Sequence, residues 1–397
     1  MAGSRDESER VVKGDVRGDV IDWKKVRKEF AKLKVPRFVF NPMCEPMESV
    51  DYVMELSQRS SGKTTQWLLI GLILNKLYGS VIHYFRSTEP MIEPKTVRDQ
   101  FNVIVSQGYI SKITDGKWSA IRYWGRRWYY CNYDEDGHVV DQSEDYVCIN
   151  MCIAKSDEYK SSYQTVKANL IIFDEFVGKY YPKDEFVYFM DLLSTVIRKN
   201  EHALVVMLAN SINRNSPYFE EFGIRKAVAK MMPGDYQYIE TNLGTRLSVR
   251  FIEGGLDQRQ SYVNKKYFGF DNPKLSAITG GGWAFRQYPH LCNADVGEVE
   301  RILDNIYLKH NGELIRMALC HSSNLNYFVH CVRGVEPQDD AIIFTSGVPN
   351  DRREVYGLGF SDLHKKVWVL LQRNRFYYST NEIGDMVDDY VHTIKQR

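Results

Sequence analysis

The chain has 397 residues, 44% of them hydrophobic and 13% aromatic, which excludes an intrinsically disordered protein and leaves room for two or three folded domains. Its formal net charge of +1 excludes a globally basic nucleic-acid coat protein, although a locally basic lining remains compatible with this balance. The longest apolar run is far shorter than the roughly 20 residues that span a bilayer, and the charged N-terminus has no signal-peptide core, so we expect no membrane association.

The N-terminal segment contains one helical pattern. Residues 1–20 are rich in charge, and we expect them to lie in solvent. Four apolar residues then recur at helical spacing within residues 21–34, namely Trp23, Val26, Phe30 and Leu33. Three placements are open for this helix: on the core of the protein, on a neighbouring subunit, or in solvent. We assign residues 1–35 to an N-terminal extension.

From residue 51 onward, strands and helices alternate. The predicted strands are continuous apolar runs at residues 51–56, 80–86, 169–176 and 203–210. The predicted helices lie at residues 63–77, 95–110 and 184–200. Apolar strands separated by helices predict an α/β domain with a parallel sheet that is covered by helices on both faces. We assign residues 36–252 to this domain.

A β-rich insert interrupts the alternation at residues 117–140. The Asp-Gly pair at 136–137 is a strong signal for a hairpin turn. Tryptophans in such a segment are more typical of sheet packing than of base stacking. The insert contains three of them: Trp118, Trp124 and Trp128.

The composition changes after residue 252. Residues 253–285 contain glycine runs without a clear period, and we expect them to form a linker or a lid. Residues 286–397 contain short strands and end in a helical segment, which predicts a separate and smaller α+β domain.

A loop of small residues joins the first predicted strand to the first long helix. It reads SQRSSGKT at residues 57–64 and matches the phosphate-binding pattern G-x-x-x-x-G-K-[S/T], except that Ser57 replaces the first glycine. Backbone N–H groups and a helix N-terminus cradle phosphates in such loops. Lys63 would contact the β- and γ-phosphates of ATP, and the Thr64 hydroxyl would bind Mg²⁺. The predicted nucleotide contacts of this loop are Ser57, Arg59, Ser60, Ser61, Gly62, Lys63, Thr64 and Thr65.

Two carboxylates end the apolar strand LIIFDEF. Asp174 would hold Mg²⁺ through its water shell, and Glu175 would orient and deprotonate a water molecule beside the γ-phosphate. The alternative is an ordinary strand end. An adjacent Asp-Glu pair after a phosphate loop favours hydrolysis of ATP over transfer to a substrate hydroxyl.

Two further polar residues end neighbouring elements. Asn210 ends the next apolar strand, where it either senses the γ-phosphate or simply favours a turn. Arg198 ends the helix between the two strands, where it either reaches the nucleotide of a neighbouring subunit or balances the helix dipole. Arg214 and Arg225 are further candidates for the first of these two roles.

These features occur in the order of a known family. The matching segments are Phe40-Asn41-Pro42, the loop at 57–64, HYFR, GRRWYY, LIIFDEF, TVIRKNE, LAN and SPYF. Between about residues 38 and 222 the chain therefore resembles the DNA-packaging ATPases of phi29-like short-tailed phages. The resemblance implies a P-loop NTPase fold of the additional-strand, catalytic-glutamate type. It also implies that the C-terminal domain is like an RNase H-type nuclease without activity.

The resemblance also implies a function. It predicts ATP-driven translocation of double-stranded DNA into a procapsid by a homo-oligomeric ring, a pentamer in this family, at the portal vertex. Implied partners are the portal and a structural packaging RNA; the implied location is the host cytoplasm and not the mature virion. Arg198 takes the place of the trans-acting arginine, and Arg86 that of a basic residue beside the site. A second trans-acting basic position falls near Glu89 or Lys95 and stays open.

Such a motor would grip DNA through its phosphates without reading bases. Candidate contacts on loops are Lys155, Lys160 and Lys179, each of which is also compatible with an ordinary surface lysine. Basic residues of the C-terminal domain are weaker candidates for contact with DNA, portal or RNA: Arg333, Lys365, Arg373 and Arg375. That domain offers no set of three carboxylates for two-metal cleavage, so we expect no nuclease activity.

Two other functions remain open. The first is a monomeric, kinase-like or helicase-like P-loop ATPase in which Arg198 acts within its own subunit. The second is a nucleotide-binding assembly adaptor with negligible turnover.

Overall fold

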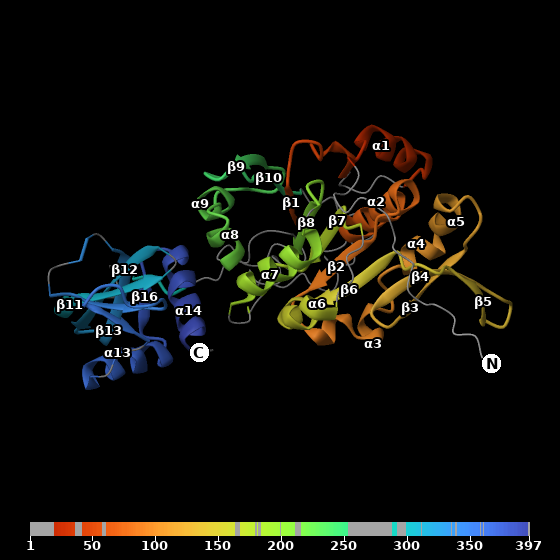
Figure 1. Cartoon of the computed structure of the whole chain (residues 1–397). Coiled ribbons are helices and arrows are strands. Elements are labelled where there is room, and N and C mark those ends of the chain that lie inside the picture. Colours follow the sequence, from red (N-terminus) through yellow and green to blue (C-terminus); the bar gives the residue numbers. More distant parts are fainter. Residues whose placement is uncertain are drawn as a thin grey trace, which may run out of the picture. The chain divides into compact units, whose positions relative to one another are not determined.

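The computed structural model divides the chain into two compact units, and each is described by itself (Figure 1). One unit comprises residues 1–211 and 221–262, and the other comprises residues 212–220 and 263–397. No helix in the described part of the chain is both long and apolar enough to cross a membrane. The structure describes residues 20–35, 42–57, 61–162, 167–178, 181, 184–198, 200–210, 216–252, 288–291, 299–310, 312–334, 336–337, 340–357, 359 and 361–395.

The first unit is built on a ten-stranded sheet with the order β3-β4-β6-β2-β7-β8-β1-β10-β9, in which β5 pairs with β4. Neighbouring strands from β6 to β10 in this order are parallel. These strands are β1 (Tyr52–Ser57), β2 (Ile82–Arg86), β6 (Cys148–Cys152), β7 (Leu170–Asp174), β8 (Leu204–Asn210) and β10 (Arg246–Phe251). The antiparallel ones are β3 (Ala120–Trp124), β4 (Arg127–Tyr133), β5 (Val139–Gln142) and β9 (Tyr236–Glu240). The predicted parallel α/β sheet is therefore confirmed, and β8 lies between β1 and β7.

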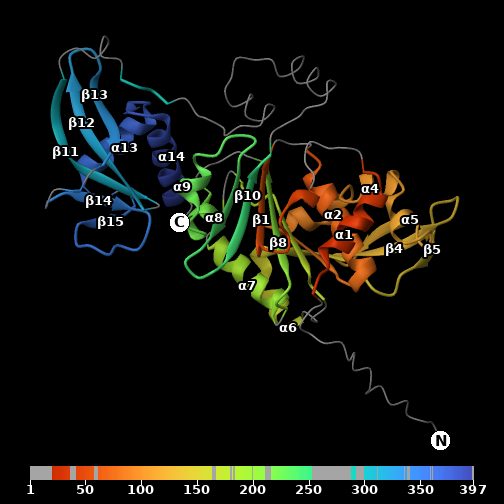
Figure 2. The same ribbon diagram turned by 90° about the horizontal axis from the view of Figure 1, so that it is seen from above.

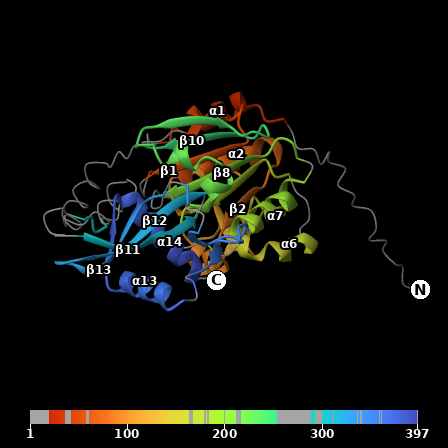
Figure 3. The ribbon, with the colours of Figure 1, turned by 90° about the vertical axis from the view of Figure 1, so that its left-hand side faces the viewer.

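Helices cover both faces of the parallel strands. The long helix α2 (Lys63–Tyr78) shares its apolar cluster with Ile172 of β7. Helix α7 (Glu185–Ile197) covers the other face, where the ring of Phe189 lies 5.1 Å from that of Phe173. Adjacent residues of a strand point to opposite faces, which explains why neighbours in β7 contact different helices. Figure 3 shows α1 and α2 on one side of the strands and α7 on the other.

The N-terminal helix α1 (Trp23–Lys32) packs on the core of this unit, which is the first of the three placements considered (Figure 2). Its buried residues are Trp23, Val26 and Phe30. Asp22 caps the helix, because its side chain accepts hydrogen bonds from the backbone N–H groups of Lys24 and Lys25. The backbone N–H of Asp22 also donates to the Tyr78 hydroxyl at the end of α2, at 3.0 Å.

The single helix predicted at residues 95–110 is wrong. The chain instead forms three short helices, α3 (Pro94–Val97), α4 (Asn102–Ser106) and α5 (Tyr109–Ile113). Gly108 separates the last two with a φ of 67°, a left-handed conformation that a continuous helix does not allow. The apolar period was real, because the regularly spaced residues Val97, Phe101, Ile104 and Ile110 are all buried.

The predicted hairpin at Asp136-Gly137 is confirmed, since β4 and β5 pair in antiparallel fashion around it. Gly137 takes the positive φ that this turn requires, 83°. Two of the three tryptophans of the insert pack as expected, because Trp118 and Trp128 are buried. Trp124 does not: it ends β3 with 64% of its surface exposed.

Short elements complete this description of the chain up to residue 252. They are η1 (Pro42–Cys44), η2 (Glu89–Ile92), η3 (Ile153–Lys155), α6 (Ser156–Ser162), α8 (Pro217–Glu221) and α9 (Arg225–Val228). The predicted linker at residues 253–285 lies outside the described residues.

The second unit is an α+β arrangement around a six-stranded sheet with the order β15-β14-β11-β12-β13-β16. Strands β11, β12 and β13 form an antiparallel meander, and the remaining pairs are parallel. Its core includes Phe344, Trp368 and Tyr390. The elements are β11 (Val299–His310), β12 (Glu313–Ser322), β13 (Asn326–Arg333), β14 (Ile342–Thr345), β15 (Glu354–Tyr356), α13 (Asp362–Gln372), β16 (Phe376–Tyr378) and α14 (Asn381–Lys395).

Candidate nucleotide-binding site

Polar side chains gather where three neighbouring parallel strands end. The strands lie in the order β7-β8-β1 and end at Asp174, Asn210 and Ser57. Because they are parallel, their carboxyl ends meet at one edge of the sheet, and Ser57 is the direct register partner of Asn210. Helix α2 begins at this edge with Lys63. Gly62 precedes the helix with a φ of 81°, which is the conformation that glycine adopts without strain.

Lys63 lies at the centre of this group and is almost fully buried, with 7% of its surface exposed. Its Nζ donates hydrogen bonds to Ser57 Oγ at 2.7 Å and to Asn210 Oδ1 at 3.3 Å. The Ser57 hydroxyl also lies 2.8 Å from that of Ser61. Burial lowers the pKa of Lys63, and the negative charge of Asp174 opposes that shift. Both hydrogen-bond acceptors are neutral, so the ammonium charge remains available for an anion at the helix N-terminus.

Asp174 accepts hydrogen bonds from two hydroxyl groups. Thr64 Oγ1 donates to its Oδ2 at 3.2 Å, and the Tyr84 hydroxyl donates to the same oxygen. Burial and the nearby carboxylate raise the pKa of Tyr84 well above its usual value, so this hydroxyl stays protonated and keeps donating. Oxygen ligands of this type suit Mg²⁺, which binds hard carboxylate and hydroxyl donors. Thr64 and Asp174 are therefore the residues that would hold the ion.

Glu175 stands in an unusual backbone conformation, with a φ of 61°. Its carboxylate is about half exposed and pairs with Arg86, whose Nη2 lies 2.9 Å from Oε2. The other guanidinium nitrogen of Arg86 lies 3.5 Å from Asp174 Oδ2, so this arginine bridges both acids at the end of β7. Positive φ at a residue other than glycine is costly and is frequent at functional sites, which fits the position of Glu175.

Arg198 follows α7 with an exposed side chain and a φ of 44°. Its Nε donates to the backbone oxygen of Thr195 at 3.1 Å, in the last turn of that helix. Among the interactions seen in the described residues, none joins Arg198 to the group around Lys63. The contact with Thr195 is what the helix-end interpretation predicts, while the exposure of the side chain is compatible with reaching another subunit.

The candidate DNA contacts are ion-paired where the structure describes them. Lys155 contacts Glu158 at 2.8 Å and Glu89 at 3.0 Å. Lys160 contacts Asp157 at 2.8 Å and Asp191 at 3.1 Å. Four residues predicted for the nucleotide site or for DNA contact lie outside the described part of the chain: Arg59, Ser60, Lys179 and Arg214.

Four of the remaining basic candidates also have acidic or carbonyl partners. Arg333 pairs with Glu313 at 2.9 Å, Lys365 lies 3.5 Å from Asp362, and Lys95 lies 3.1 Å from Glu93. Arg375 donates to the backbone oxygen of Leu325. Arg373 follows α13 as its C-cap, and Arg225 begins α9. Thr65 is the third residue of α2. None of the side-chain contacts named in this paragraph reaches the group around Lys63.

The sequence analysis missed three residues that lie at or beside the site, namely Tyr84, Glu55 and Trp67. Tyr84 of β2 contacts Asp174, and Glu55 of β1 contacts Trp67 of α2. A signal existed for Glu55, because a carboxyl group interrupts the otherwise apolar strand Tyr52–Leu56. Tyr84 carried no such signal, since tyrosine is common in strands.

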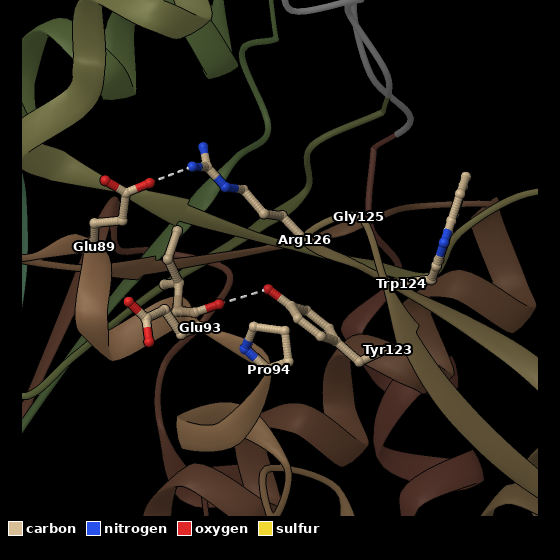
Figure 4. Close-up of a pocket in the computed structure, with 8 residues that line it drawn as sticks. Glu89, Glu93, Pro94, Tyr123, Trp124, Gly125 and Arg126 are labelled. Carbon is tan, nitrogen blue, oxygen red and sulfur yellow. Dashed lines mark hydrogen bonds and ion pairs between the residues drawn. The ribbon is translucent and has the colours of Figure 1, made fainter.

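A hollow of about 370 Å³ lies near the turn between β3 and β4, apart from the residues of this site (Figure 4). Arg126 of this turn pairs with Glu89, and the Tyr123 hydroxyl donates to the backbone oxygen of Ile92 at 2.7 Å. The lining residues are Glu89, Ile92, Glu93, Pro94, Tyr123, Trp124, Gly125 and Arg126. None of them belongs to the group around Lys63.

The fold and the site define a mixed α/β protein with a lysine-bearing loop at the carboxyl edge of its parallel strands. No protein-family model and no curated protein matches the sequence. Among solved structures, the gp11 DNA packaging motor of phage phi28 is similar, with a TM-score of 0.51 and 16% identity over 90% of this chain and 98% of that one. The viral genome packaging motor assembly of bacteriophage phi29 is similar with a TM-score of 0.57 and 13% identity, over 90% of this chain and 100% of that one.

The chain therefore has the fold of these phage packaging motors over most of its length. The resemblance detected in the sequence is confirmed at the level of the fold.

Proposed function

We propose that this protein is an ATPase that converts ATP hydrolysis into translocation of double-stranded DNA during packaging of a phage genome. The single observation that carries the proposal is the group around Lys63. Lys63 Nζ donates to Ser57 and Asn210, and the hydroxyl of the adjacent Thr64 donates to Asp174. Both sets of bonds lie at the carboxyl edge of β7-β8-β1. The fold shared with packaging motors supports the same assignment.

Each residue would have a defined task. Lys63 and the N-terminus of α2 would bind the β- and γ-phosphates, and Asn210 would contact the γ-phosphate. Thr64 and Asp174 would hold Mg²⁺, which when bound neutralises charge on the phosphates. Glu175 would accept a proton from the attacking water. In the present arrangement Glu175 is paired with Arg86, so hydrolysis requires that pair to open or to turn toward the water.

The strand order supports a P-loop NTPase of the additional-strand type, with β8 as the strand between the phosphate loop and the acidic pair. We keep the inactive nuclease-like assignment for the second unit as part of the proposal. The proposed domains are residues 1–35, 36–252, 253–285 and 286–397. Packing of α1 on the core of the first unit makes the first boundary the least distinct.

The working form would be a homo-oligomeric ring at the portal vertex, with five subunits as in the family. It would act in the host cytoplasm. Arg198 would reach the nucleotide of the adjacent subunit, which its exposed side chain permits. The portal and a packaging RNA are proposed partners. Lys155 and Lys160 each sit between two acids, so either would have to exchange these partners for a DNA phosphate and would gain little from a single contact.

The decisive experiment is phosphate release by the purified protein with and without duplex DNA. We expect saturable turnover that duplex DNA accelerates, and loss of turnover in Lys63→Ala. Equal rates with and without DNA would remove translocation from the proposal and favour the kinase-like alternative. Saturable ATP binding without turnover would favour the assembly adaptor.

A further inference from the structure

Strand β1 contains a carboxyl group in the middle of the core. Glu55 is fully buried, as are its apolar neighbours Met54 and Leu56. A carboxyl group therefore occupies a position where the rest of the strand is apolar. In the sheet it lies between Leu208 of β8 and Arg250 of β10. Burial raises the pKa of Glu55 well above its usual value. A buried acid in a central strand breaks the local pattern, and such breaks are expected at functional positions.

The carboxyl group makes one hydrogen bond, and that bond crosses from strand to helix. Oε1 accepts from Trp67 Nε1 at 2.8 Å, whereas Oε2 is buried and has no hydrogen-bond partner among the residues that the structure describes. The charged groups that influence Glu55 are Lys63 of α2, Glu45 after η1, and Arg250 of β10. Arg250 itself pairs with Glu45 at 3.0 Å. The bond to Trp67 is therefore the contact that fixes the position of this side chain.

This bond and the contact of Lys63 form two parallel links. Glu55 and Ser57 are two residues apart in a strand, so they point to the same face. Lys63 and Trp67 are four residues apart in a helix, so they also share a face. The link from Ser57 to Lys63 lies at the phosphate edge, and the link from Glu55 to Trp67 lies one step deeper in the core. Together they span the loop that joins β1 to α2.

We propose that Glu55 is a positioning residue of the phosphate-binding loop, which holds the first turns of α2 against the end of β1 through Trp67. This inference rests on the proposed ATPase function. The bond between Glu55 and Trp67 fixes the position of Lys63 along the axis of α2 relative to Ser57 and Asn210. It also holds Ser57 and the start of α2, which flank the loop, in fixed positions relative to each other before nucleotide binds.

The test removes each end of the link separately. Glu55→Met removes the acceptor at similar length, Trp67→Phe removes the donor and keeps an aromatic ring, and Glu55→Gln keeps an acceptor oxygen. We expect the first two to weaken binding of a non-hydrolysable ATP analogue with Mg²⁺ on the order of tenfold. The double variant Glu55→Met with Trp67→Phe should lose no more affinity than either single variant, because both substitutions remove the same bond. Glu55→Gln should recover most of the affinity.

The matched control is Met54→Leu, a buried change on the opposite face of β1. It should shift thermal stability without changing the affinity for the analogue, which separates positioning from general loosening of the core. Additive losses in the double variant, or unchanged affinity in Trp67→Phe, would overturn the inference. Should Glu55→Met not fold, Trp67→Phe alone decides.

The outcome is also distinguishable from failure of the proposed function. Absence of saturable binding in the unmodified protein would end both ideas. Binding that Lys63→Ala abolishes, combined with unchanged affinity in Trp67→Phe, would overturn the role of Glu55 and leave the ATPase proposal standing.

Discussion

Arg86 donates a hydrogen bond to Glu175 across 2.9 Å, so the candidate general base is held in an ion pair at the end of β7. The same guanidinium lies 3.5 Å from Asp174. The carboxylate oxygen that accepts from Arg86 is directed at the guanidinium and not at a water molecule beside a nucleotide. If Glu175 is the general base, as we propose, this pair must open before Glu175 can activate water.

Glu175→Gln tests the base directly. Glutamine keeps the size of the side chain and an oxygen that can accept from Arg86, but it cannot take a proton. We expect unchanged affinity for ATP and a fall in turnover on the order of a hundredfold or more. Binding of a fluorescent ATP analogue and phosphate release measure the two quantities. Unchanged turnover would remove Glu175 from its role.

Arg86→Met tests the pair from the other side. The substitution removes the guanidinium and keeps an unbranched stem in a position that is mostly buried. Glu175 then loses its partner and is free to turn toward water. If DNA normally opens this pair, turnover without DNA should rise relative to turnover with DNA. The ratio of the two rates is the measurement. A ratio equal to that of the unmodified protein would show that the pair does not restrain hydrolysis.

Mixtures with Arg198→Ala test the proposed action between subunits. If Arg198 completes the site of a neighbour, inactive subunits block active ones, and turnover falls more steeply than in proportion to the variant fraction. A proportional fall would place the arginine in its own subunit or at the helix end, where it contacts the Thr195 carbonyl. Loss of thermal stability with full turnover in the variant alone would favour the helix end.

Asn210→Asp tests the contact with the γ-phosphate. Asn210 Oδ1 lies 3.3 Å from Lys63 Nζ. A carboxylate at this position would neutralise the lysine and repel the terminal phosphate, so ATP should bind about tenfold more weakly, or roughly 1.4 kcal/mol. ADP lacks the γ-phosphate and should lose less. Asn210→Ala is the control, because it removes the amide without adding charge. Equal losses for ATP and ADP would place Asn210 away from the γ-phosphate.

The sequence predicted the parts of this site that follow a local pattern. Strand β7 is a continuous apolar run that ends in Asp174, and the loop before α2 matches a known motif at Gly62 and Lys63. Strands β6 and β10 were not predicted. Cys148–Cys152 mixes polar and apolar residues although all of them are buried, and Arg246–Phe251 carries two arginines and a serine.

Contacts between distant elements were not predictable in the same way. Tyr84 contacts Asp174 only because β2 lies beside β7. The order of strands in a sheet cannot be predicted from any single segment of the sequence. The helix predicted at 95–110 shows that even a correct local pattern can leave the number of helices undetermined. Its apolar spacing is compatible both with one long helix and with several short ones, and the left-handed turn at Gly108 decided the outcome.

His83 gives a prediction for the dependence of stability on pH. The side chain is fully buried in β2, its Nδ1–H donates to the backbone oxygen of Val81 at 3.0 Å, and burial lowers its pKa from 6.5 to about 4. Between these values the unfolded chain takes up a proton that the folded protein rejects, so stability is lost as the pH falls from 6.5 toward 4. The loss would amount to roughly 3 kcal/mol.

His83→Asn keeps a donor near the position of Nδ1 and cannot take up a proton. We expect its unfolding temperature to change less than that of the unmodified protein between pH 6.5 and pH 4.5, measured on the transition of the first unit. The matched control is His138→Asn, on an exposed hairpin with 80% of its side chain accessible, which should keep the original pH dependence. Parallel curves for His83→Asn and the unmodified protein would mean that other groups, chiefly paired carboxylates, account for the acid sensitivity.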